Sequence, residues 1–313
     1  MKRIIYILLT SIIFVAAFVC LKYITFGLVM PKANYGMRAI CSAREVTDLY
    51  LGSSMFRQGI DACELGDQTY LLAYSSNRPF HEAMQLKNLI DNGAKIKRVI
   101  VDMYPYSIVR DVGISDIRMI QDGDMKYTFN IYSAMHKIGY PITTLYDMLI
   151  LQNNELFLTM PITYWPMNSR YVRGSNPTVR HGKSADDLAT LEPKTVESLV
   201  MNKSQIDGLN QIIQLCQKYN MDLVFLETPK YIKINEDDVY NKLMREFVEF
   251  LAERNMTIIL FTKTLNKVAD VINESKVYSY EFDDSNPLYY IDLYHISYEG
   301  RKELTKKLKK ILD

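Results

Sequence analysis

Two short stretches near opposite ends of the chain carry residue types that could cleave or transfer an ester bond. The first is Gly52-Ser53-Ser54, and the second contains Asp292 and His295, three residues apart. A serine hydroxyl is a weak nucleophile at neutral pH, so it needs a base such as histidine to take its proton. The histidine in turn needs a carboxylate that holds its tautomer and stabilises the imidazolium. Together these residue types indicate nucleophilic acyl transfer.

Both stretches lie where proteins of alternating strands and helices present reactive groups. Ser54 follows the end of an expected strand and opens a turn or helix. Asp292 and His295 precede an expected helix, and their i, i+3 spacing places both side chains on the same side of a turn. Either stretch alone is also typical of a plain loop, since Gly-Ser-Ser is a common loop tripeptide. Their coincidence in one chain favours the catalytic interpretation.

The elements that must position these groups alternate between strands and helices. Five apolar runs predict strands, and the segments between most of them carry helical spacing. Strands without polar alternation need cover on both faces. The pattern predicts a three-layer α/β sandwich around a five-stranded, mostly parallel sheet. The expected strands are 45–52, 69–75, 98–103, 222–227 and 256–261, and the expected helices are 80–92, 195–219, 237–254, 263–273 and 297–312.

The N-terminus carries an uninterrupted apolar run, Ile4 to Leu21, after Lys2 and Arg3. A run of about 18 or more apolar residues is typical of a membrane helix. It is longer than the apolar core of most signal peptides and no clear cleavage site follows it, so we expect an uncleaved anchor, with a cleaved signal peptide as the alternative. A single anchor with basic residues at its start leaves the remainder outside the cytoplasm. The expected organisation is an anchor at 1–30, a linker at 31–44 and a catalytic domain at 45–313.

Residues 106–194 depart from the regular pattern, with scattered aromatic residues and prolines. We expect an insertion that contains helices near 130–138 and 142–151. Such an insertion is typical of a lid or binding surface, and the alternative is a structural extension without substrate contact. It contains basic residues that could contact an anionic polymer or form a solvated loop. These are Arg170, Arg173, Arg180 and Lys183.

Composition excludes some classes of function. The net charge of +1 argues against a nucleic-acid partner. The four cysteines form no Cys-x-x-Cys pair and no histidine cluster accompanies them, so we expect neither a zinc site nor another cofactor. Cys41 and Cys63 could form a disulfide outside the cytoplasm, and two separate thiols are equally consistent with the sequence. His81, His136 and His181 are interpreted as surface or packing groups rather than catalytic ones. Arg57, three residues after Ser54, could face an anionic substrate or be a solvated side chain.

The first of these stretches, Tyr50 to Ser54 with Gly59-Ile60-Asp61 after it, resembles the first sequence block of the SGNH (GDSL-type) hydrolase superfamily. Asp292-x-x-His295 with Gly300 resembles the last block. The resemblance covers the chain from about residue 45 to the end, except the insertion, and implies an SGNH or flavodoxin-like fold. It implies that Ser54 is the nucleophile, His295 the base and Asp292 its orienting acid. It also implies that the Ser54 N–H is one oxyanion donor.

The chain departs from the family pattern in two middle blocks. The second block normally supplies a glycine N–H after strand two, where this chain has Ser75-Ser76-Asn77, so the backbone of Ser76 is the candidate donor. The third block normally supplies an Asn side chain after strand three. Here Asp102-Met103-Tyr104-Pro105-Tyr106 contains no Asn. By the standard of the family, the oxyanion hole is incomplete.

Membrane-anchored members with Gly-Ser-Ser in the first block are similar to D-alanyl transfer proteins and to envelope polysaccharide O-acyltransferases and esterases. The resemblance therefore implies a membrane-anchored, extracytoplasmic serine esterase or O-acyltransferase. Its substrate would be the acetyl or D-alanyl groups of a cell-envelope glycopolymer such as a teichoic acid, and a membrane-bound O-acyltransferase is an expected partner. The alternative is a catalytically inactive SGNH-fold partner or glycan-binding module of such a system. A general lipid esterase is a third hypothesis.

Overall fold

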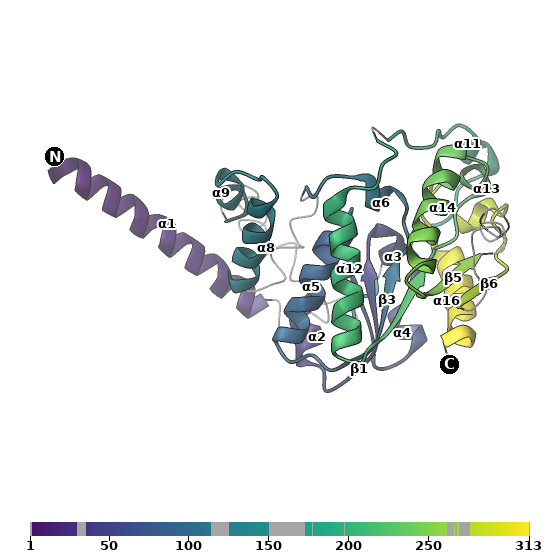
Figure 1. Ribbon diagram of the computed structural model, residues 1–313, viewed down its shortest axis with the longest axis horizontal. Coiled ribbons are helices and arrows are strands. Elements are labelled where there is room, and N and C mark those ends of the chain that lie inside the picture. Colours follow the sequence, from purple (N-terminus) through teal and green to yellow (C-terminus); the bar gives the residue numbers. More distant parts are fainter. Residues whose placement is uncertain are drawn as a thin grey trace.

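Six strands form one parallel sheet at the centre of the globular part (Figure 1). The computed structural model describes residues 2–29, 36–113, 125–149, 173–176, 178–196, 198–261, 266, 268 and 276–312. The order of the strands across the sheet is β2-β1-β3-β4-β5-β6. They are β1 (Val46–Gly52), β2 (Thr69–Ala73), β3 (Ile96–Asp102), β4 (Asp222–Leu226), β5 (Thr257–Phe261) and β6 (Val277–Tyr280).

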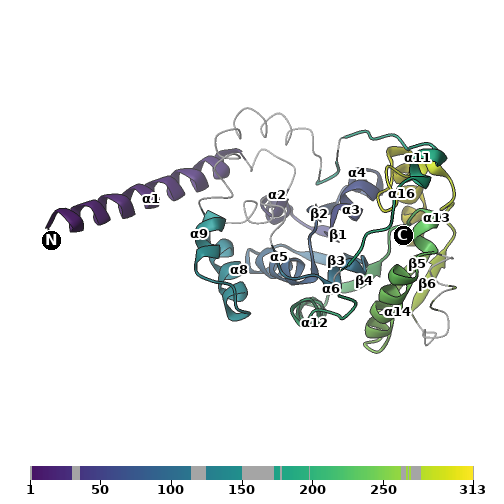
Figure 2. The ribbon, with the colours of Figure 1, turned by 90° about the horizontal axis from the view of Figure 1, so that it is seen from above.

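Helices cover both faces of the sheet, as the view from above in Figure 2 shows. One face carries α5 (Pro79–Asp91), α12 (Lys203–Lys218) and α14 (Asp238–Ala252), and the other carries α3 (Ser54–Gly59), α4 (Ala62–Leu65) and α16 (Tyr298–Leu312). This confirms the predicted three-layer α/β sandwich. The remaining helical elements are α1 (Lys2–Val29), α2 (Gly36–Ser42), α6 (Tyr106–Val109), α8 (Met125–Lys137), α9 (Thr143–Leu149), α11 (Ala185–Ala189), α13 (Ile232–Asn235) and the 3₁₀ turn η3 (Pro287–Tyr289).

The strands are rich in apolar residues because both faces of the sheet are covered. In β1, Leu49 and Leu51 pack into the core on the α5 side, whereas Tyr50 packs into the core on the α3 side. All three side chains are fully buried. Because successive residues of a strand point to opposite faces, a strand covered on both faces needs apolar residues at consecutive positions.

The five predicted strands are confirmed, but the prediction of a five-stranded sheet is wrong because β6 adds a sixth. Its sequence, Val277-Tyr278-Ser279-Tyr280, is too short and too polar to be distinguished from a loop. It lies at the edge of the sheet, where only β5 pairs with it and its side chains remain partly exposed. An edge strand needs no continuous apolar run, so the pattern that identified the other strands missed it.

The predicted helices 80–92, 237–254 and 297–312 are confirmed as α5, α14 and α16. The prediction for 195–219 begins too early, because α12 starts only at Lys203. The side chain of Asn202 accepts the N–H of Ser204 and so caps the helix there. Of the predicted helix 263–273, only Asn266 and Val268 are described, and both are helical; the rest lies outside the described residues.

Two segments expected to be irregular contain helices. The linker at 31–44 includes α2, whose Met37 and Ile40 are buried in the main core. The globular part therefore includes residues before 45. The segment 61–68, which we expected to be a polar loop, contains α4, capped by the side chain of Asp61. Among the described residues there is no disulfide bond, so the pairing of Cys41 and Cys63 that the sequence allowed is not made.

The N-terminal helix α1 extends away from the globular part (Figure 1). Its segment Lys2–Leu21 has a mean hydropathy of 2.8 and is exposed. It is long and apolar enough to cross a membrane, a property that it shares with signal sequences.

The insertion at 106–194 is partly built into the core. Helix α8 packs on α5 and buries Tyr127, Ile131 and Met135, and the predictions for 130–138 and 142–151 overlap α8 and α9. At Arg173 the chain lies against the outer edge of β2, where the carbonyl of Arg173 accepts the N–H of Leu71. Gly174 has a φ of 87°, and a Cβ there would lie 1.9 Å from the Leu71 carbonyl oxygen. Arg170 lies outside the described residues.

His81 on α5 provides a test of this packing. The ring is fully buried, and its Nε2 lies 3.0 Å from the carbonyl oxygen of Val112, to which it donates a hydrogen bond. Burial lowers the pKa of His81 from 6.5 to about 4. The unfolded chain therefore binds a proton between these pH values that the folded protein does not bind.

We expect His81→Gln to flatten the pH dependence of stability in this window. In the wild-type protein, the contribution of His81 to the free energy of unfolding is complete above the pKa of the unfolded chain, about 6.5. As the pH falls from about 6.5 toward 4, this contribution is lost, and the loss reaches up to about 3 kcal/mol. Glutamine keeps a donor for the Val112 carbonyl and does not titrate. The measurement is urea unfolding of the full chain in detergent at several pH values, with the exposed His136→Gln as control. Equal slopes for wild type and His81→Gln would contradict this account.

Candidate active site

The site lies at the carboxyl edge of the sheet, where β1 ends and the loop before α16 returns to it. Ser54 is the first residue of α3, directly after the end of β1. Asp292 and His295 lie between η3 and α16. In a parallel sheet all strands end at the same edge, which is where open α/β sheets place their ligands.

The structure brings Ser54, His295 and Asp292 together in one hydrogen-bonded chain. Ser54 Oγ lies 2.8 Å from His295 Nε2. On the other side of the ring, His295 Nδ1 lies 2.8 Å and 3.0 Å from the two carboxylate oxygens of Asp292. The distances suit transfer of the serine proton to Nε2, with the carboxylate fixing the proton on Nδ1.

Asp292 is held as an anion by its surroundings. Burial raises the pKa of its carboxyl group, but the His295 ring and the backbone N–H groups of Tyr294 and His295 outweigh burial and lower it to about 2. Both backbone N–H groups donate to Oδ1 at 2.8 Å. The carboxylate is therefore ionised at neutral pH and can stabilise an imidazolium ion.

The loop that carries Asp292 and His295 is a tight, closed turn. The N–H of Ile291 donates to the carbonyl of His295 at 3.0 Å, which closes the turn across these two residues. Ser297 Oγ donates to the Leu288 carbonyl and accepts the N–H of Gly300. A Cβ at Gly300 would lie 2.4 Å from the Tyr289 carbonyl oxygen and from the Ile296 side chain. Glycine there lets α16 begin directly against the turn.

Ser53 fixes the orientation of its neighbour Ser54. Its hydroxyl donates to Asp102 Oδ2 at 2.5 Å and accepts the N–H of Met55 at 3.2 Å. The Ser53 N–H donates to the same Asp102 oxygen at 3.3 Å. Ser53 therefore caps α3 and ties the turn to the end of β3. The sequence identified Asp102 only as a departure from the family pattern, whereas the structure shows that it binds this turn.

A buried lysine that the sequence analysis missed lies close to this turn. Lys230 is 1% exposed, and its amine donates to the carbonyl and the hydroxyl of Thr228. Burial lowers the pKa of Lys230 to about 8, although Asp102 and Glu227 oppose the shift. Burial likewise raises the pKa of Asp102, and Lys230 opposes that change. The sequence signal that could have identified Lys230 is a lysine that follows the end of an apolar strand by four residues and stands next to a proline.

The candidate oxyanion donor Ser76 lies in the turn after β2. It has a left-handed backbone with a φ of 56°. The next side chain, Asn77, is buried and donates through Nδ2 to the Gly52 carbonyl at 3.2 Å. Arg57, which lies on α3, donates to the hydroxyl of Ser75 in this turn at 2.7 Å. These contacts hold the turn against the one that carries Ser54, and the role of Ser76 stays a prediction.

The other histidines lie apart from this chain of hydrogen bonds. His81 is buried on α5. The ring of His136 bonds the Tyr140 carbonyl, and His181 pairs with Glu299 at the surface. Each has a local structural role, in agreement with its expected role as a packing or surface group.

Comparisons with known proteins identify no relative by sequence. No family model and no curated protein matches the chain. One solved structure, described as that of a candidate platelet activating factor from Streptococcus pneumonia, is similar with a TM-score of 0.38 and 12% identity. The match covers 88% of this chain and 89% of that chain. A likeness at this level identifies neither a family nor an activity.

The close approach of Asp102 to the serine turn gives a prediction for Gly52. A Cβ at Gly52 would lie 2.6 Å from the Asp102 Cβ and 2.9 Å from the Phe56 ring. We expect Gly52→Ala to lower the free energy of unfolding by about 1–3 kcal/mol, because both neighbours must move. Gly59→Ala is the matched control, since its Cβ would meet nothing closer than 3.5 Å.

Urea unfolding of the two variants, in parallel with wild type, measures the difference. Gly59→Ala should remain within about 1 kcal/mol of wild type, since alanine is favoured over glycine in a helix. Equal stability of Gly52→Ala and Gly59→Ala would show that the serine turn is not packed against Asp102 as described.

Proposed function

We propose that the protein is a membrane-anchored serine esterase or O-acyltransferase that acts on acyl groups of a cell-envelope glycopolymer. The observation that carries the proposal is the hydrogen-bonded chain from Ser54 through His295 to Asp292. A serine next to a histidine whose other nitrogen faces an ionised carboxylate is the arrangement that acyl transfer through a covalent intermediate needs.

The proposed reaction has two halves. In the first, Ser54 Oγ attacks the ester carbonyl carbon while His295 Nε2 takes its proton. The tetrahedral intermediate carries its negative charge on the former carbonyl oxygen, which the N–H groups of Ser54 and Ser76 are proposed to bind. The C–O bond to the leaving alcohol then breaks, and the alcohol takes the proton from His295. The acyl group stays on Ser54.

In the second half, His295 activates a hydroxyl group that attacks the acyl-serine. Water as the attacking group gives an esterase, and a hydroxyl of a sugar or polyol gives a transferase. Either way the proton returns to Ser54 when the C–O bond to its oxygen breaks. Asp292 remains ionised throughout and stabilises the imidazolium that forms twice in each cycle.

The proposed location and substrate class rest on α1 and on the two sequence blocks. An apolar N-terminal helix long enough to span a membrane supports a catalytic domain anchored outside the cytoplasm. The blocks at Gly52–Ser54 and Asp292–His295 resemble those of envelope O-acyltransferases. The proposed acyl group is acetyl or D-alanyl, the proposed polymer is a polysaccharide or teichoic acid, and the proposed partner is a membrane-bound O-acyltransferase.

Covalent labelling with a fluorophosphonate tests the nucleophile. We expect the wild-type full chain to be labelled and Ser54→Ala to lose all labelling, because the probe traps an activated serine. His295→Ala and Asp292→Asn should label more slowly by about 100-fold or more. Ser285→Ala, at an exposed serine, should label as wild type does. The measurement is in-gel fluorescence over time, with the modified peptide identified by mass spectrometry.

The non-catalytic alternative makes the opposite prediction. The segment from Asp102 to Tyr106 contains no Asn where the family has its oxyanion Asn, and Asp102 Oδ2 instead binds Ser53, which favours a lost activity. If the folded wild-type protein is not labelled and cells with Ser54→Ala acylate their polymer normally, the chain serves as a partner or glycan-binding module.

A further inference from the structure

We propose that a pocket at the same edge of the sheet as the proposed catalytic residues binds an oxyanion of the substrate, a phosphate or a carboxylate, through Arg78 and Arg110. The pocket has a volume of about 580 Å³ and is lined by Arg78, Val109, Arg110, Asp111, Gly113, Thr195, Val196 and Ser198. That volume lies within the usual range of small-molecule sites. The catalytic use of this subsite rests on the function proposed above, whereas anion binding does not.

The two arginines reach the pocket from the carboxyl edge of the sheet. Arg78 ends the loop after β2 and directly precedes α5, and Arg110 follows α6, which itself follows β3. The other wall consists of Thr195, Val196 and Ser198. The pocket is thus built from the same edge that carries Ser54, on the side of the sheet covered by α5 and α12.

Among the described residues that line the pocket, two arginines face one acidic residue. Arg78 donates to the Asp111 carbonyl, and its Nε is buried without a hydrogen-bond partner in the described part of the chain. Burial and the nearby positive charge of Arg110 both lower the pKa of Arg78. Asp111 is the one acidic residue among the described lining residues, and its carboxylate accepts a hydrogen bond from Asn202 at 3.2 Å.

Arg110 is the second arginine that lines the pocket. Within the described ranges its guanidinium makes no hydrogen bond or ion pair, although its backbone carbonyl accepts from Gln205. Two guanidinium groups near each other repel, and an oxyanion between them removes this repulsion while accepting several N–H donors. Arginine is suited to this role because its planar fork matches the geometry of phosphate and carboxylate groups.

Lys194 connects this pocket with the proposed catalytic residues. Its amine lies 4.5 Å from the centre of the Tyr294 ring and donates to the Tyr104 hydroxyl at 3.2 Å. Its charge is attracted by Asp292 and repelled by Arg110. Lys194 therefore lies within electrostatic range of both Arg110 and Asp292, and we assign an anion bound in the pocket to the same substrate as an ester at Ser54.

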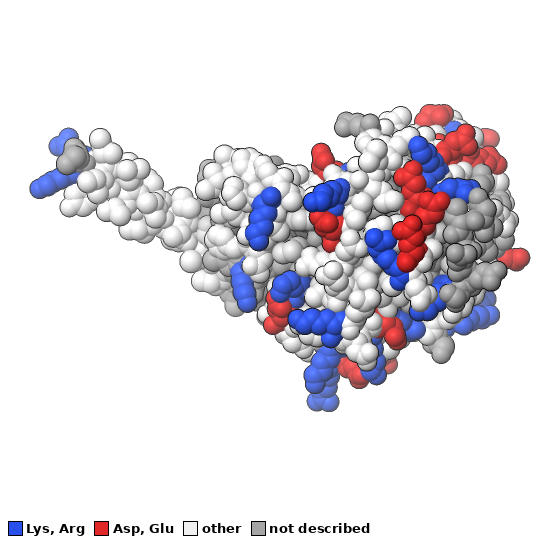
Figure 3. Space-filling model, viewed as in Figure 1, with Lys and Arg blue, Asp and Glu red and all other residues white. Residues whose placement is uncertain are grey.

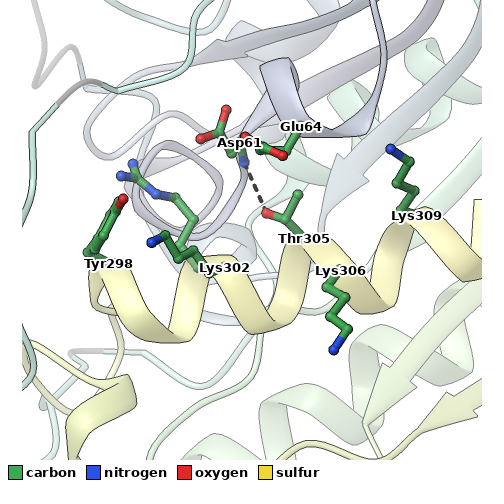
Figure 4. Close-up of a pocket in the computed structure, with 8 residues that line it drawn as sticks. Asp61, Glu64, Tyr298, Lys302, Thr305, Lys306 and Lys309 are labelled. Carbon is green, nitrogen blue, oxygen red and sulfur yellow. Dashed lines mark hydrogen bonds between the residues drawn. The ribbon is translucent and has the colours of Figure 1, made fainter.

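Two other basic regions among the described residues differ from this pocket. On the face seen in Figure 3, lysine and arginine side chains alternate with aspartate and glutamate. A second pocket of about 330 Å³ lies between α4 and α16 and contains Lys302, Lys306 and Lys309. Figure 4 shows these lysines spread along α16, with Asp61 and Glu64 opposite them. In that pocket Arg301 donates to the Asn176 carbonyl and Lys302 lies over the Tyr298 ring, so two of its four basic side chains already have partners.

Binding of inorganic phosphate to the full chain in detergent tests the subsite, with isothermal titration calorimetry as the measurement. We expect the wild type to bind phosphate and Arg110→Gln to bind it at least about fivefold more weakly, from the loss of a charge-assisted contact. Arg78→Gln should do the same, and Arg110→Gln remains decisive if Arg78→Gln fails to fold. Lys218→Gln, at the far end of α12, removes the same charge and should bind as wild type does.

Acetate in place of phosphate distinguishes the two oxyanions. Preference for phosphate assigns the subsite to a phosphorylated substrate, and equal or tighter binding of acetate assigns it to a carboxylated one. No binding of either anion by the wild type would overturn the proposal, as would equal affinities for wild type and Arg110→Gln. A loss in Lys218→Gln as large as that in Arg110→Gln would also overturn it, by showing a nonspecific charge effect.

A pair of acetylated sugars, one with a phosphate group and one without, tests the catalytic use. The wild type should show a higher kcat/KM for the phosphorylated ester, and Arg110→Gln should lose that preference mainly through KM. Phosphate binding without fluorophosphonate labelling would keep the subsite and reject the serine mechanism. Labelling without phosphate binding would keep the mechanism and reject the subsite.

Discussion

The position of the proposed nucleophile depends on one carboxylate oxygen. Asp102 Oδ2 accepts both the hydroxyl and the N–H of Ser53, and this pair of hydrogen bonds ties the end of β1 to the end of β3. Ser53 in turn caps α3, so the direction of that helix and the place of Ser54 follow from the same contact. Gly52 contributes by having no Cβ, since one would collide with Asp102. The His295 side of the site is built around this fixed turn.

This arrangement requires charged groups in the interior. Asp102 is 4% exposed and Lys230 is 1% exposed, and each lowers the electrostatic cost of burying the other. Removing one partner of such a pair leaves the other charge uncompensated, which is more destabilising than the pair is stabilising. The contacts that position the turn are the hydrogen bonds from Ser53 to Asp102, whereas the Lys230 amine donates to Thr228.

The remainder of the carboxyl edge is basic and aromatic. Tyr104 and Tyr294 pack edge to face, and Lys194 lies against both rings. Arg110 extends the positive charge into the neighbouring pocket. The segment that the sequence marked as an insertion contributes to the core through α8 and to this edge through Arg110 and Lys194. It is therefore both a structural extension and a part of the proposed substrate surface.

The sequence by itself determined the layer architecture, because strands buried on both faces contain runs of consecutive apolar residues and amphipathic helices alternate with them. It also determined which serine, histidine and aspartate to examine, since they follow a strand or precede a helix at the right spacing. Only the tertiary structure decided that Ser54 and His295, 241 residues apart, lie within hydrogen-bond distance. It also decided the roles of Asp102 and Lys230. Contacts between distant segments depend on strand order and side-chain packing, and neither leaves a periodic signal in the sequence.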